Sequence, residues 1–126
     1  MNKIADFFDT LADRWDELCY HDPEKLNDIL QRTGLRKGLR ILDIGCGTGV
    51  LESYLLPYSP RQIVGVDLSP AMIEKARSTY ATPVVDFRCQ DVWDIQGESF
   101  DYIIAYSVFP HCQEPEKLVT QLAGIL

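Results

Sequence analysis

Hydrophobic positions follow a helical period in the first part of this chain. Between positions 3 and 19, apolar residues recur every three or four places, and acids and Arg14 fill the positions between them. This spacing predicts an amphipathic helix whose apolar face consists of Ile4, Phe7, Phe8, Leu11, Trp15 and Leu18. A second helix is expected from Asp22-Pro23, with proline at its first helical position, to Gly34.

Beyond position 40 the pattern changes to short apolar runs separated by helical segments. The runs predict strands at 41–44, 63–67, 84–88 and 100–106. Helices are expected at 50–56, ended by Pro57, then from the Ser69-Pro70 start signal to about Tyr80, and from Glu114-Pro115 toward Leu126. Strands that alternate with such helices pair in parallel and carry helices on both faces. The fold class is therefore α/β, with a doubly wound parallel sheet.

A glycine-rich corner follows the first predicted strand. Asp43 precedes Gly45, Gly47 and Gly49, and a helix comes next. Glycine lets a backbone turn tightly and approach a ligand, and the free amides at the start of a helix favour negative or polar ligand groups. A dinucleotide loop would place a third glycine at Val50 or Glu52, so the spacing favours S-adenosylmethionine over a nicotinamide dinucleotide.

Composition narrows the class of partner. The 126 residues suffice for one domain, and the formal net charge of −7 argues against a broad electrostatic grip on nucleic acid or an anionic membrane. The four cysteines form no Cys-x-x-Cys pair and no zinc spacing, so no metal is expected. We see neither a secretory signal nor an apolar run long enough to span a membrane, and we expect a cytoplasmic protein with reduced thiols.

The glycine loop, Asp67 at the end of the second strand and Asp91 after the third strand together resemble class I S-adenosylmethionine-dependent methyltransferases. The chain is most similar to the small-molecule branch that includes ubiquinone and menaquinone methyltransferases. The resemblance implies a Rossmann-like core over residues 36–126 and a helical lid over residues 1–35. Family members carry further C-terminal strands, so this core is expected to be shortened.

The same resemblance implies which residues bind the cofactor. Asp43 would hold the glycine loop and the methionine part, and Asp67 would accept hydrogen bonds from both ribose hydroxyls. Asp91 and Val92 would recognise adenine, whereas Met72 packs either on adenine or in the core. The complete expected set is Asp43, Gly45, Cys46, Gly47, Gly49, Asp67, Leu68, Met72, Asp91, Val92 and Tyr106.

Candidates for chemistry lie near the end of the fourth strand. Tyr106 and Ser107 should face the methyl group or the substrate, because ligands of open α/β sheets lie beyond the carboxyl ends of the strands. His111 is either a general base or a surface loop histidine. Trp15 and Tyr20 are the expected lid residues that exclude water, with core packing as the alternative.

Three functions remain open at this point. The first is methyl transfer from S-adenosylmethionine to a small-molecule acceptor. The second is a cofactor-binding fragment or subunit without activity, and a nucleotide-dependent oxidoreductase ranks third. Because the fourth strand is apolar throughout, an uncovered edge there would favour pairing with another copy, and we expect a homo-oligomer.

Overall fold

The computed structural model describes residues 23–80, 82–105 and 115–126. Its centre is a sheet of four strands in the order β3-β2-β1-β4, and every neighbouring pair is parallel. The strands are β1 (Arg40–Ile44), β2 (Gln62–Asp67), β3 (Val85–Cys89) and β4 (Tyr102–Ile104). The predicted parallel α/β sheet is thus confirmed, although β4 is shorter than the predicted strand.

The described helices are α3 (Pro23–Arg32), α4 (Glu52–Leu55), α5 (Pro70–Thr79) and α6 (Pro115–Ile125), with short 3₁₀ turns η2 (Leu56–Tyr58) and η3 (Val92–Asp94). Ser69 caps α5 as predicted, because its side chain accepts a hydrogen bond from the Met72 amide at 3.2 Å. The α-helix α4 ends before Pro57, as predicted, and the chain continues into η2. Pro57 lies inside η2, in a first turn, where a missing amide costs no hydrogen bond.

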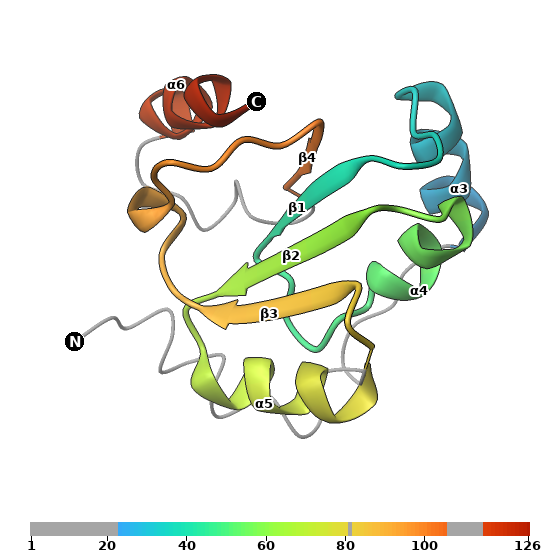
Figure 1. The fold of residues 1–126 in the computed structure, drawn as a ribbon, viewed down its shortest axis with the longest axis horizontal. Coiled ribbons are helices and arrows are strands. Elements are labelled where there is room, and N and C mark those ends of the chain that lie inside the picture. Colours follow the sequence, from blue (N-terminus) through green and yellow to red (C-terminus); the bar gives the residue numbers. More distant parts are fainter. Residues whose placement is uncertain (1–22, 81, 106–114) are drawn as a thin grey trace.

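Side chains of the strands alternate between two apolar layers. On one face, Ile41, Ile63 and Phe87 pack with residues of α3, α4 and α5. On the other, Leu42, Val64 and Val66 pack with the segment before β4 and with Ile125 of α6. Figure 1 shows α5 and α6 on opposite sides of the sheet. Helices on both faces explain why β1 and β2 read as nearly continuous apolar runs.

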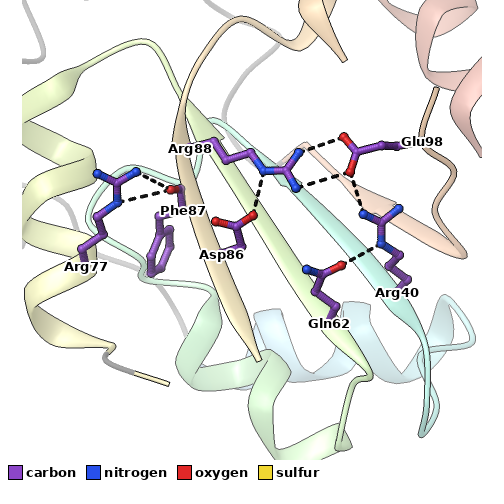
Figure 2. A network of polar contacts seen from close by, with 7 residues as sticks. All are labelled: Arg40, Gln62, Arg77, Asp86, Phe87, Arg88 and Glu98. Carbon is purple, nitrogen blue, oxygen red and sulfur yellow. Dashed lines mark hydrogen bonds and ion pairs between the residues drawn. The ribbon is translucent and has the colours of Figure 1, made fainter. Parts of the chain in front are cut away.

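A polar network holds the segment that leads from β3 to β4 (Figure 2). Glu98 accepts from Arg40 Nη2 at 2.7 Å and from Arg88 Nη1 at 2.8 Å. The Arg40 guanidinium also lies 4.5 Å from the centre of the Phe100 ring. One carboxylate on this segment therefore joins the first residue of β1 to β3.

The outer strands of the described sheet are β3 and β4. The three residues of β4 are only half-buried, as a strand with one neighbour should be. The predicted helix over residues 3–19 lies outside the described residues. Among the described helices, none has the length and apolar character needed to cross a membrane.

Candidate functional site

The glycine loop leaves the carboxyl end of β1 with three residues in the left-handed region. The φ angles of Gly45, Gly47 and Gly49 are 66°, 56° and 91°. The amides of Gly45 and Cys46 both donate to the Val66 carbonyl, at 2.8 and 3.1 Å, so the loop is fastened to β2. A side chain at these φ angles would be strained, which is the local reason for the glycines.

Gly49 has a second reason to be glycine. A Cβ there would lie 2.8 Å from Tyr80 Cε2 and 3.3 Å from Phe87 Cζ, both closer than ordinary contact. The loop therefore packs directly against the residue that ends α5 and against β3. The sequence analysis assigned Gly49 to the cofactor alone, and it missed this internal packing because Tyr80 and Phe87 lie far along the chain.

Asp67 connects the glycine loop to the start of α5. Its Oδ2 accepts from the Gly47 amide and its Oδ1 accepts from the Ser69 amide, each at 2.9 Å. The carboxylate is half-buried at the end of β2. A carboxylate accepts through two oxygens, which is the chemistry that two hydroxyl groups of a ligand require.

The segment after β3 approaches the same edge of the sheet. The Gln90 amide donates to the Asp67 carbonyl at 3.1 Å, and Asp91 caps η3 by accepting from the Trp93 amide at 3.1 Å. Val92 is buried, whereas Leu68 between β2 and α5 is half-buried. The structure thus brings Asp67, Leu68, Asp91 and the glycine loop to one end of the sheet.

Met72 and Cys46 are buried in the described protein. Met72 is 1% exposed, as the core interpretation of this residue expects. Burial raises the pKa of the Cys46 thiol well above its usual range, and the nearby carboxylates Asp43, Glu52 and Asp67 raise it further. The thiol therefore stays neutral and is a poor nucleophile.

Two buried carboxyl groups meet at the base of the glycine loop. Asp43 on β1 is 1% exposed and Glu52 at the start of α4 is 0% exposed. Their four carboxyl oxygens have no hydrogen-bond partner among the described residues. Burial raises the pKa of Asp43 well above its usual range, and Glu52 raises it further through its charge and through a hydrogen bond.

The sequence analysis did not predict a role for Glu52. Burial raises its pKa too, and its interactions with Asp43 and with its own backbone oppose part of that rise. One signal in the sequence pointed to Glu52: it is an acid among the apolar residues Val50, Leu51, Leu55 and Leu56, about one helical turn after Gly49. An acid on the inner side of a helix needs a reason, and the helix phase alone did not show that Glu52 faces inward.

Several predicted site residues cannot be placed. Trp15, Tyr20, Tyr106, Ser107 and His111 lie outside the described residues. Over the ranges that the structure describes, no three His, Cys, Asp or Glu side chains gather as metal ligands would.

A glycine loop at the carboxyl end of a parallel sheet, with one acid at the end of β2 and another after β3, defines a cofactor-binding α/β domain. The family described as "Methyltransferase domain" matches residues 41–126. The chain belongs to this family.

Relatives and solved structures agree with this assignment. The ubiquinone biosynthesis O-methyltransferase of Xanthomonas campestris pv. campestris is 31% identical over 133 residues, which cover 96% of this chain and 55% of that protein. The chain thus spans about half the length of this relative.

Two solved structures share the fold. Magnesium protoporphyrin IX methyltransferase (ChlM) from Synechocystis, with bound SAH, has a TM-score of 0.78 at 23% identity, over 97% of this chain and 66% of that one. The [4+2]-cyclase SpnF has a TM-score of 0.84 at 22% identity, over 98% of this chain and 56% of that one. At these identities the two structures support the Rossmann-like methyltransferase architecture alone.

Proposed function

We propose that this domain binds S-adenosylmethionine and that the whole protein transfers its methyl group to a small-molecule acceptor. The observation that carries the proposal is the hydrogen bond between the Gly47 amide and Asp67, because it places a carboxylate beside the glycine loop. Family membership and the SAH bound to the Synechocystis relative support the same cofactor.

The residues present fit this cofactor. The loop of Gly45, Cys46, Gly47 and Gly49 offers a backbone that a ligand can approach closely. Asp43 lies just before this loop, and its carboxyl oxygens have no hydrogen-bond partner among the described residues, so they are available to a polar or cationic ligand group. We assign the ribose hydroxyls to Asp67 and Leu68, and adenine to Asp91 and Val92. Met72 of α5 and Tyr106, which follows β4 in the sequence, complete the proposed cofactor set.

S-adenosylmethionine supplies an electrophilic methyl group on a positively charged sulfur. The chain has to bind the acceptor, orient its nucleophile and exclude water. Alignment of two bound reactants lowers a barrier by about 7–11 kcal/mol. We propose His111 as the base for an acceptor that must lose a proton, Ser107 as a substrate contact, and Trp15 and Tyr20 as the lid.

Two rival functions are an inactive cofactor-binding domain and an oxidoreductase. SpnF has the same fold and is named a cyclase, so the fold does not by itself establish methyl transfer. A domain that spans half of its relative could bind the cofactor without turnover. An oxidoreductase would bind a nicotinamide dinucleotide, and family membership argues against this rival.

Calorimetric titration of the purified chain with S-adenosylmethionine, S-adenosylhomocysteine and NAD tests the proposal. We expect the first two to bind with one-to-one stoichiometry and NAD to give no heat. Tight NAD binding without S-adenosylmethionine binding would overturn it. Binding without methyl transfer to any quinol-type phenol, by this chain and by an extended chain, would support the inactive binding domain.

The assembly of the protein is a separate proposal. The half-buried apolar strand β4 lies at an edge of the described sheet, and such an edge favours pairing with a further strand. We propose that a second copy of the chain covers it.

A further inference from the structure

The buried pair Asp43 and Glu52 is not explained by the fold. The two residues come from β1 and α4, on the face of the sheet that packs against α3, α4 and α5, and both are almost fully inaccessible. An ionised carboxylate without a hydrogen-bond donor is costly to bury. A proton on either group removes one charge and creates a donor to the other group.

Among the described residues, no cation compensates the charge of the pair. Apart from the two carboxyl groups themselves, the titratable group that acts on the pair is Asp67 at the end of β2, which is also an acid. No lysine or arginine of the described ranges contributes to the shift of either carboxyl group. Within the described part of the chain the pair therefore has no cationic neighbour, and the proposed ligand would bring it a positive charge.

We propose that Asp43 and Glu52 share one proton at the base of the glycine loop, and that Glu52 thereby makes the site favour a cationic ligand. The proposal rests on the proposed function. Two adjacent acids titrate as a pair, and a nearby cation stabilises the doubly ionised form. Binding of a sulfonium ligand should therefore expel the shared proton, so that the pair gains its second negative charge.

The pair of ligands needed for the test already exists. S-adenosylmethionine and S-adenosylhomocysteine differ in one methyl group and in the positive charge on sulfur. Only the first brings the sulfonium charge, so it should release more of the shared proton. The site would in this way favour the charged substrate over its neutral-sulfur product. Glu52 is a specificity-determining residue here, since it acts through Asp43 and not on the methyl group.

The experiment is calorimetry of the wild-type chain at about pH 6.5, where the ligand ammonium groups are charged. Repetition in buffers of different ionisation enthalpy counts the protons released. We expect a measurable fraction of a proton with S-adenosylmethionine and a smaller one with S-adenosylhomocysteine. The affinity ratio of the two ligands should rise with pH, by at most about tenfold per pH unit for one proton.

Glu52→Gln is the informative variant, because the amide keeps the shape and can donate to Asp43. The difference in proton release between the two ligands should disappear, and the affinity ratio should become independent of pH. Glu74→Gln removes an exposed acid from α5 and should behave as wild type. Equal release by both ligands, or an unchanged difference in Glu52→Gln, would overturn the inference while leaving cofactor binding intact.

The free protein provides a second readout that needs no ligand. A carboxyl pair with raised pKa holds its proton more tightly when folded, so its contribution to stability is lost as pH rises through the folded pKa. The melting temperature of Glu52→Gln should fall less than that of wild type from about pH 5 to pH 9. Parallel curves would contradict a shared proton. If S-adenosylmethionine does not bind at all, the proposed function is wrong; if it binds without the expected proton release, only the inference about Asp43 and Glu52 is wrong.

Discussion

The Gly47 amide donates a hydrogen bond to Asp67 across 2.9 Å, although 20 residues separate the two positions. The contact joins the loop after β1 to the end of β2, and the second oxygen of Asp67 holds the Ser69 amide. One carboxylate therefore sets the position of the loop and also faces the end of the sheet where a ligand would lie.

Replacement of Asp67 tests its proposed role in binding. Asp67→Asn should weaken S-adenosylmethionine binding by about tenfold or more, since a hydrogen bond to a charged group contributes about 1.5–3 kcal/mol. Asp94→Asn is the matched control, because Asp94 is an exposed acid in η3. Calorimetry checks both variants, and thermal melts identify any general loss of structure. Equal affinity in Asp67→Asn and wild type would exclude Asp67 from the site.

Gly49 should resist substitution more than another glycine of similar conformation. Gly49→Ala adds a Cβ into Tyr80 at φ 91°, whereas Gly38→Ala adds one at φ 82° with nothing within 4 Å. Both variants carry backbone strain of about 1–3 kcal/mol, and only the first adds overpacking of similar size. Denaturant unfolding should therefore rank Gly49→Ala well below Gly38→Ala. Equal losses would mean that Tyr80 moves aside without cost.

Low pH should weaken the ion pairs that Glu98 forms with Arg40 and Arg88. Hydrogen bonds from Arg88 and Arg40 hold the pKa of Glu98 below its usual range, so the stabilisation is present above the unfolded pKa of about 4.3 and is lost as pH falls through the folded pKa. Glu98→Gln should cost about 1 kcal/mol at pH 7 and less below pH 4, given the partial exposure of the pair. Urea unfolding at the two pH values measures this difference. Glu116→Gln, an exposed acid of α6, should show no such change.

The position of β4 at an edge of the described sheet predicts association in solution. Sedimentation over a range of concentrations should give a mass at least twice the 14.3 kDa of one chain. Dilution should shift the distribution toward the monomer if the contact is a single short strand. A mass of one chain at millimolar concentration would refute pairing through β4.

Much of the fold was predictable because its signals are local. The alternating apolar runs predicted the four strands. The Ser69-Pro70 pair predicted the start of α5, with Ser69 as the cap and Pro70 as the first helical residue. Pro57 likewise predicted the end of α4, and the 3₁₀ turn that follows accepts a proline that an α-helix interior excludes.

The amino-acid sequence by itself determined the strands, the glycine loop, the acid that ends β2 and the acid after β3, because each depends on neighbours a few residues away. Tertiary structure decided that β4 lies at an edge, that Gly49 packs on Tyr80, and that Asp43 meets Glu52. These contacts arise from the strand order and from the rotation of α4 about its axis. Neither is encoded in local spacing, and only the folded chain brings these residues together.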